Sequence, residues 1–80
     1  MIVEINKKAI KDLSKIDNKE VDKILLKIDT LKDFPNVPNY KKLTNFDPPF
    51  RLRIGNYRAL FNVDGDKVTV YRIRHRKESY

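Results

Sequence analysis

The stretch FRLRIGNYRALFNVDGDKVTVYRIRH, residues 50–75, decides the fold. Apolar and polar residues alternate along it, which is the period of a β-strand with one buried face. Gly55-Asn56 and Asp64-Gly65 interrupt this alternation with residues that accept the positive φ of tight turns. The stretch therefore predicts an antiparallel meander of three strands. We expect these strands at residues 50–54, 57–63 and 67–75.

Two helices are predicted ahead of the meander. Asn6 can cap the first, a short helix whose apolar residues recur at helical spacing. Asp17 and Glu20 form a variant of the capping box for the second helix, which ends near Phe34-Pro35. The apolar stripes are Ile10, Leu13 and Ile16 on the first helix, and Val21, Ile24, Leu25, Ile28 and Leu31 on the second. We expect a helical hairpin, with the lysines on its other faces forming solvated surface.

The remaining segments complete the predicted fold. Residues 1–5 are β-prone and predict one more strand, whereas residues 35–49 hold all four prolines and predict an irregular connector. The expected fold class is α+β: an N-terminal strand, a two-helix hairpin and an antiparallel β-meander, with the helices packed on one face of a four-stranded sheet. Because 80 residues suffice for one small core, we expect residues 1–80 to form a single domain.

The arginines are confined to the last thirty residues, while the first fifty carry only lysine as a cation. They are Arg51, Arg53, Arg58, Arg72, Arg74 and Arg76. A guanidinium group is planar and offers several donors, a geometry that suits phosphate. Of the net charge of +7, residues 50–80 contribute +5, from eight basic and three acidic side chains. Nucleic acid is the predicted ligand, although an acidic protein would also suit this charge.

Strand alternation predicts which face of the sheet carries the arginines. Leu52 and Ile54 alternate with Arg51 and Arg53, so the two sets face opposite sides. In the last strand, strict alternation places Thr69, Tyr71, Ile73 and His75 opposite Val68, Val70, Arg72, Arg74 and Arg76. If the apolar sets cover the helices, all six arginines project from the other side. The alternative is a solvated basic face without chemistry.

Composition limits the classes of site and compartment. The absence of cysteine excludes disulfides and thiolate metal sites, and it fits a reducing cytosol. No segment approaches the ~18 apolar residues of a membrane span, and the start of the chain lacks a signal-peptide stretch, so we expect a soluble, cytoplasmic protein without a membrane partner. Asp64 and Asp66 are interpreted as turn residues with no third ligand nearby, and we predict no metal or other cofactor.

Residues 50–61, FRLRIGNYRALF, together with residues 64–80, DGDKVTVYRIRHRKESY, resemble the RelE/ParE toxin superfamily. The shared pattern is a basic-x-basic-x-G-x-Y-R hairpin and an H-R-x-x-x-Y tail, within a strand–helix–helix–meander order that covers the whole chain. In the RelE branch, the resemblance implies a toxin that cleaves mRNA on the ribosome without a metal. The ribose 2′-hydroxyl attacks the adjacent phosphorus, leaving a cyclic phosphate and a free 5′-hydroxyl. An acidic antitoxin is the implied partner, in a toxin–antitoxin hetero-oligomer.

The resemblance also implies catalytic roles. Arg58 matches the arginine of the Y-R pair and would contact the scissile phosphate. Arg76 matches the tail arginine and would act beside the leaving oxygen, and Tyr80 matches the terminal tyrosine, a base or a stacking group. A tyrosine needs a lowered pKa to act as a base, which surrounding arginines can provide.

Four further residues are expected to bind substrate. Arg51 and Arg53 stand where the family has basic residues on the first hairpin strand. Because arginine hardly deprotonates, they are predicted to contact substrate and stabilise charge rather than to act as bases. Arg74 and His75 complete the set, although a lone histidine among core-facing residues is more often structural.

Two other function classes stay open on the sequence alone. The ParE branch implies a gyrase poison that traps cleaved DNA and performs no nuclease chemistry. A non-catalytic nucleic-acid-binding member is the third class. In each case we expect Leu60, Val68 and Val70 to leave apolar surface on the arginine-bearing face, and the helical hairpin to offer a groove, for an amphipathic antitoxin.

Overall fold

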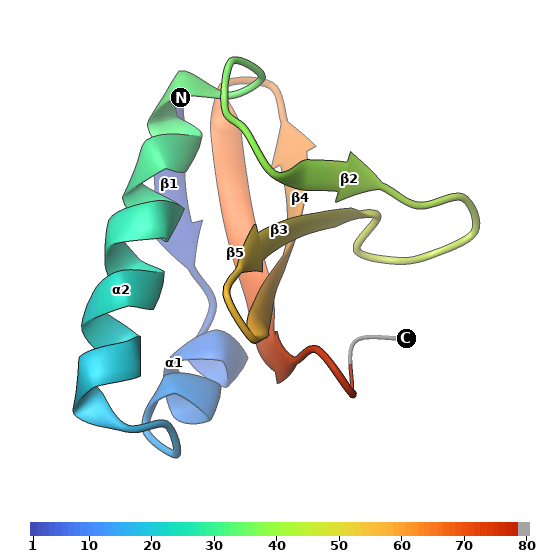
Figure 1. Ribbon diagram of the computed structural model, residues 1–80. Coiled ribbons are helices and arrows are strands. Elements are labelled where there is room, and N and C mark those ends of the chain that lie inside the picture. The colour runs from blue at the N-terminus through green and yellow to red at the C-terminus, as the bar shows by residue number, and fades with distance from the viewer. Residues whose placement is uncertain (79–80) are drawn as a thin grey trace.

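The structure, a computed structural model, describes residues 1–78 of the chain (Figure 1). Strand β1 (Ile2–Ile5) leads into helices α1 (Lys7–Leu13) and α2 (Asn18–Asp29), and α2 continues as a short 3-10 helix, η1 (Thr30–Asp33). The strands that follow are β2 (Tyr40–Lys42), β3 (Phe50–Ile54), β4 (Tyr57–Asp64) and β5 (Lys67–His75). Neither helix is long and apolar enough to cross a membrane.

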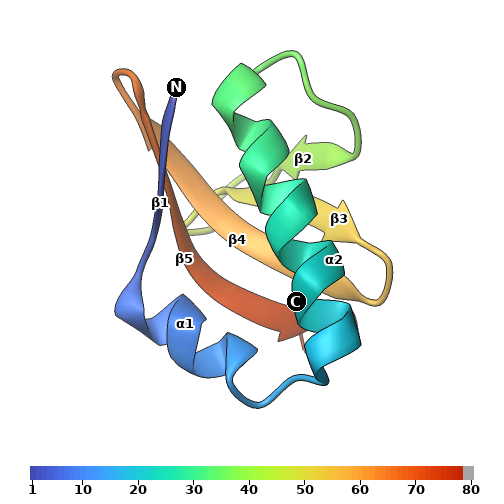
Figure 2. The same cartoon turned by 90° about the vertical axis from the view of Figure 1, so that its left-hand side faces the viewer.

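The strands form a single sheet with the order β1-β5-β4-β3-β2. Strand β1 runs parallel to β5, and the other neighbouring pairs are antiparallel. Both helices lie on the same face of this sheet (Figure 2). The predicted α+β class, the meander and its two turns are therefore confirmed.

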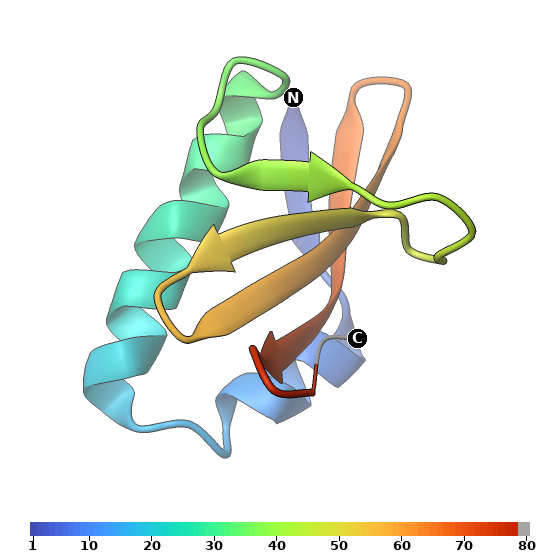
Figure 3. The same ribbon diagram turned by 45° about the vertical axis from the view of Figure 1, so that its right-hand side comes forward.

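The sheet has five strands, whereas the sequence predicted four. The additional strand is β2, which lies inside the expected irregular connector and pairs with β3 (Figure 3). Its three residues contain no proline, so their backbone N–H groups stay available for pairing. The prolines flank the strand instead of interrupting it: Pro38 precedes it, and Pro48 and Pro49 follow.

The helix starts are capped as predicted. The Asn6 side chain accepts a hydrogen bond from the Lys8 backbone N–H at 2.9 Å, and the Asp17 side chain accepts one from Lys19 at 2.9 Å. The apolar stripes are confirmed only in part. The predicted members Leu13, Ile24, Ile28 and Leu31 are buried. Ile10 is 55 % exposed and Leu25 is 40 % exposed, and the buried residue of α1 that the stripes did not include is Ala9.

The core lies between the helices and the sheet. Its largest fully buried side chains are Phe61, Ile24, Leu31, Leu52, Val68 and Val70. Phe50 stacks on Phe61 with ring centroids 5.1 Å apart, and Phe34 meets both rings edge-on. Burying a side chain of this size contributes about 1.5–3 kcal/mol. Because the core covers one face of the sheet, the side chains that alternate with the core residues point away from the helices.

A β-bulge changes the expected pattern in β5. Leu60 lies opposite Arg72 while Phe61 lies opposite Val70, so Tyr71 is an extra residue without a partner in β4. The bulge reverses the alternation at Tyr71. The prediction that Val68 and Val70 share the arginine-bearing face was therefore wrong: both are fully buried in the core, on the same side as Ile73.

Candidate nucleic-acid interface

Three arginines lie side by side across the meander. Arg53 on β3 pairs with Arg58 on β4, and Arg58 pairs with Arg74 on β5. We call these three residues the arginine row. Their neighbours Leu52, Ala59 and Ile73 form the adjacent row and are buried against the helices, so the arginine row faces the opposite side.

The arginine row is a local concentration of positive charge. Neighbouring strands lie about 4.8 Å apart, so three guanidinium groups emerge within about 10 Å of sheet width. Like charges directly opposite one another destabilise a sheet. Three arginines held in register therefore indicate a binding site for an anion. An anion placed over the arginine row offsets the repulsion between the guanidinium groups.

Arg58 is held in place by its own hairpin. Its Nη1 donates to the backbone oxygens of Gly55, at 2.9 Å, and Tyr57, at 2.8 Å. Gly55 adopts a φ of +59°, a conformation that glycine tolerates without strain, and so closes the β3–β4 turn beneath the arginine. These bonds use only Nη1, so Arg58 is an oriented donor at the centre of the row.

Arg51 has a structural role next to the arginine row. It is only 5 % exposed, and its Nη1 donates to the backbone oxygens of Pro48 and Phe50. Its guanidinium also lies over the Phe46 ring, 5.4 Å from the centroid. Arg51 thus anchors the loop before β3. Its predicted contact with substrate stays a prediction, although Arg51 also lines a pocket beside the arginine row.

Arg72 points to α1 rather than to a ligand site. Its Nε and Nη2 donate to the two carboxylate oxygens of Asp12 at 2.8 and 3.0 Å, and the Ile73 backbone N–H donates to the same carboxylate at 3.0 Å. The hydrogen bond from Arg72 lowers the pKa of Asp12, against the opposing effect of burial. The expectation that all six arginines form one free cluster is therefore corrected: Arg72 is committed to an internal ion pair.

A shallow pocket of about 240 Å³ lies beside the arginine row. Lys41, Arg51, Arg53 and Arg58 line it, with Asn39 and Tyr40. Lys41 was missed as a candidate because its segment was predicted to be irregular, yet β2 pairs it directly with Arg51. No local signal could have identified it, because the three residues of β2 are too few to show the period of a strand.

His75 is a packing residue in this structure. Its ring meets Tyr57 edge-on at 5.5 Å, and its Nδ1 accepts a hydrogen bond from the Lys77 backbone at 3.3 Å. By alternation it falls on the side of Ile73, across the sheet from the arginine row. Arg74 and His75 both line a pocket at the edge of β5, which Asp12 also lines.

Arg76 follows the end of β5 and lies beside the β3–β4 turn. Its backbone N–H donates to the Asn56 oxygen at 2.7 Å, which places it near the hairpin that carries Arg58. Tyr80 lies outside the described residues, so its predicted meeting with Arg58 and Arg76 stays a prediction. Within residues 1–78, no three histidine, aspartate or glutamate side chains gather into a cluster that could hold a metal ion.

The chemistry available at the arginine row follows from its side chains. Guanidinium groups can bind a phosphate through two parallel hydrogen bonds and can stabilise negative charge that develops on it. They cannot accept a proton, because they remain charged at all ordinary pH values. The row is thus suited to holding and neutralising phosphates, and any proton transfer requires another group.

Comparison with known proteins identifies the family of this chain. A family model described as the ParE toxin of the type II toxin–antitoxin system parDE matches residues 3–80. Toxin RelE3 of Methanocaldococcus jannaschii is 40 % identical over 40 residues, which are 50 % of this chain and 46 % of that protein. The match thus spans about half the length of this curated relative.

Solved structures show the same fold. The RelB-RelE antitoxin-toxin complex from Methanococcus jannaschii contains a chain with a TM-score of 0.77 and 28 % identity, covering 92 % of this chain and 91 % of that one. The RelBE2 toxin-antitoxin complex from Mycobacterium tuberculosis contains a chain with a TM-score of 0.81 and 24 % identity, and the match covers 92 % of this chain and 95 % of that one. Since the family model matches nearly the whole chain, this protein belongs to the ParE toxin family of type II toxin–antitoxin systems, within the RelE/ParE superfamily.

Proposed function

We propose that residues 1–80 form the toxin of a type II toxin–antitoxin pair, which acts in the cytoplasm as an endoribonuclease on ribosome-bound mRNA. The observation that carries this proposal is the arginine row, in which Arg53, Arg58 and Arg74 occupy three neighbouring strands. Such a row fits a chain of phosphates better than a single small anion. The similarity to a RelE toxin favours RNA as the source of those phosphates.

The proposed reaction needs no metal. The 2′-oxygen forms a bond to phosphorus while the bond from phosphorus to the 5′-oxygen breaks, giving a 2′,3′-cyclic phosphate and a 5′-hydroxyl. Arg58, oriented by its hairpin, contacts the scissile phosphate and stabilises the charge of the five-coordinate phosphorus. Arg53 and Arg74 hold the flanking phosphates.

Two proton transfers accompany these bond changes. Tyr80, as the phenolate, takes the proton of the 2′-hydroxyl, and a water molecule hydrogen-bonded to Arg76 gives a proton to the leaving 5′-oxygen. Neither assignment follows from the arginine row itself. Both rest on the match of the tail to the superfamily pattern.

The proposed partner is an acidic, amphipathic antitoxin. Solved relatives are named as antitoxin–toxin complexes, which favours such a partner. Apolar surface is available on α2, where Leu26 is 72 % exposed and Leu25 lies beside it. This surface replaces the one expected from Leu60, Val68 and Val70, because Val68 and Val70 belong to the core and Leu60 is also buried. The product of binding is a toxin–antitoxin hetero-oligomer.

Gyrase inhibition is the second candidate function. It is favoured by the matching family model, which is that of ParE toxins, and by the commitment of Arg51 and Arg72 to internal contacts. With those two arginines occupied, fewer remain for stabilising a transition state. In this alternative the arginine row binds the phosphates of DNA in the gyrase complex.

Brief expression of the chain, followed by two assays on the same cells, separates the candidates. Primer extension on translated transcripts should reveal cuts in phase with codons, and the Arg58→Ala variant should abolish them. Plasmid supercoiling should stay normal. Intact transcripts together with inhibited supercoiling would establish the gyrase alternative. Growth arrest without either change would point to a non-catalytic nucleic-acid-binding protein.

A further inference from the structure

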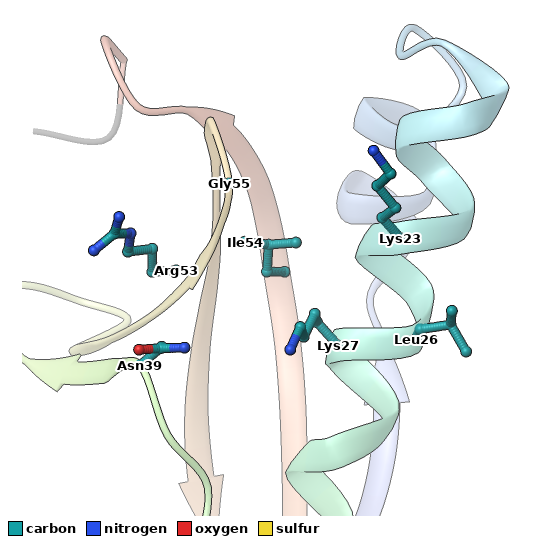
Figure 4. A pocket seen from close by; sticks show the side chains of 7 residues that line it. All are labelled: Lys23, Leu26, Lys27, Asn39, Arg53, Ile54 and Gly55. Atoms are coloured by element: carbon teal, nitrogen blue, oxygen red, sulfur yellow. The ribbon is translucent and has the colours of Figure 1, made fainter.

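A second cationic pocket lies between α2 and the end of β3, with a volume of about 520 Å³. Figure 4 shows Lys23, Leu26 and Lys27 on the helix, and Asn39, Arg53, Ile54 and Gly55 across the gap. Lys27 extends from α2 toward β3. The sequence alone assigned these lysines to solvated surface, and the tertiary structure places them beside a member of the arginine row.

The charges of α2 are divided between two sides of the helix. Lys23 and Lys27 are one turn apart and line the pocket toward β3, whereas Asp22 and Asp29 are two turns apart and line a different pocket. Leu26 lies at the boundary, because it lines both. The helix is thus close to neutral overall but positive on the side that faces the end of β3.

The cationic side chains that face the pocket are Lys23 and Lys27, and its described lining residues include no carboxylate. Arg53 also lines the pocket, but its guanidinium points away from α2 (Figure 4). Lys23 has an acidic neighbour, because its Nζ lies 3.8 Å from the Glu20 carboxylate. Both side chains are exposed, and such surface pairs contribute little. The positive potential of the pocket is therefore largely uncompensated.

This pocket continues the candidate nucleic-acid interface. Arg53 and Asn39 line both it and the smaller pocket beside the arginine row. A cationic path consequently runs from Arg74 on β5, through Arg58 and Arg53, to Lys27 on α2. A flexible polyanion can follow such a path, and lysine ammonium groups are effective point-charge partners for phosphate.

We propose that Lys23 and Lys27 bind phosphates of the RNA strand that flank the segment held by the arginine row. The strand crosses the sheet at Arg58, passes Arg53 and enters the pocket on α2. This inference rests on the proposed function and extends its substrate contacts to a helix. The ligand is single-stranded RNA, bound through its backbone without regard to base identity.

Binding of a non-cleavable RNA tests the proposal. The probe is a fluorescent 2′-O-methyl oligouridine of about 12 nucleotides, long enough for a strand-tracking groove. The double variant Lys23→Ala/Lys27→Ala is compared with Lys7→Ala/Lys11→Ala in α1, where two exposed lysines have the same spacing but line none of the described pockets. Both variants lose two positive charges, so the net charge of the protein falls by the same amount in each.

We expect the α2 variant to bind roughly tenfold more weakly at about 50 mM salt, and its salt slope to fall by about 1.4, which is two phosphate contacts at ~0.7 each. The α1 variant should stay near the wild-type values. Lys23→Arg/Lys27→Arg should restore binding, because it keeps both charges.

Four other results are informative. Equal effects of the α1 and α2 variants would overturn the inference, since only net charge would then matter. A loss of affinity for a polyglutamate peptide without a loss for RNA would also overturn it, and would make the pocket a protein-docking surface. If Arg58→Ala weakens RNA binding while the α2 variant does not, the proposed function survives alone. If neither variant weakens binding, the proposed function fails as well.

Discussion

Asp12 illustrates how a single residue closes the edge of the sheet. Strand β1 pairs with β5 only from Lys67 to Val70. Beyond that point α1 lies beside β5, and the Asp12 carboxylate takes the place of a strand neighbour by accepting the Ile73 N–H. The same carboxylate fixes Arg72, so one side chain satisfies three donors that would otherwise lack a partner at this edge.

We expect Asp12→Ala to lower the free energy of unfolding by about 2–3 kcal/mol, because it leaves a charged donor and a backbone N–H unsatisfied in a half-buried place. Urea unfolding measures this change. Asp29→Ala is the control, since Asp29 forms an exposed pair with Lys32 and its loss should cost less than about 1 kcal/mol. Equal effects at the two positions would show that the Arg72 ion pair does not stabilise the fold.

The lowered pKa of Asp12 makes the free energy of unfolding depend on pH. Because folding lowers this pKa, chiefly through the hydrogen bond from Arg72, the stabilisation is complete above the unfolded value near 3.9 and is lost as the pH falls through the lower folded value. The free energy of unfolding should therefore decline from about pH 6 to about pH 3 more steeply in the wild type than in Asp12→Asn. Urea unfolding across this range provides the measurement. Parallel pH profiles would contradict the role assigned to Asp12.

At the scale of elements, the β3–β4–β5 meander has one apolar face and one positively charged face. The face toward the helices is apolar and stabilises the fold, while the outer face keeps Arg53, Arg58 and Arg74 in one row. Stability alone would favour uncharged residues on that outer face, so the row is expected at a functional site, where proteins sacrifice some stability.

Arg53→Gln should therefore stabilise the protein by about 0.2–1 kcal/mol while weakening RNA binding, because it removes a like-charge neighbour of Arg58. The gain should shrink in high salt, which screens exposed charges. Thermal unfolding at low and high salt measures it. Lys67→Gln is the control with the opposite sign, since it loses a 3.2 Å ion pair with Glu4. A salt-independent loss of stability in Arg53→Gln would show that the row is not repulsive.

At the scale of the whole molecule, the helices and the outer face of the sheet are joined by a continuous cationic path around the end of β3. The acidic side of α2 lies on the other flank of the helix, with exposed Leu25 and Leu26. The molecule thus presents a polyanion-binding surface and a separate apolar surface with acidic edges. In the proposed function, the first surface serves RNA, and the exposed leucines of the second are available to the apolar side of the amphipathic antitoxin.

Binding of polyanions should consequently stabilise the whole fold. At a free concentration of 2′-O-methyl RNA about 100 times its dissociation constant, the expected gain is roughly 2.7 kcal/mol, because only the folded chain assembles the row. For a domain of this size the thermal midpoint should rise by roughly 10 °C or more. Circular dichroism at increasing RNA concentrations measures the rise, with Arg58→Ala as the weaker-binding comparison. An unchanged midpoint would mean that the row is not a binding site.

Much of this arrangement could be predicted from local sequence. The three strands after Phe50, the turns at Gly55 and Gly65, and the caps at Asn6 and Asp17 are all confirmed, since each depends on residues close together in the chain. Strand β2 was missed because its three residues are too few to show a period. The apolar stripes of the helices were only partly right, since a short helix can rotate to suit the sheet beneath it.

The sequence by itself determined that the chain is a helix-covered meander with its arginines gathered in the last thirty residues. Only the tertiary structure decided which of them are available to a ligand. The bulge at Tyr71 and the pairing of Arg72 with Asp12 both depend on contacts between segments far apart in sequence, which a local pattern does not encode. The register between strands aligns Arg53, Arg58 and Arg74. Hydrogen bonding between strands decides which residues are neighbours across the sheet, and the spacing of residues along the chain does not determine this.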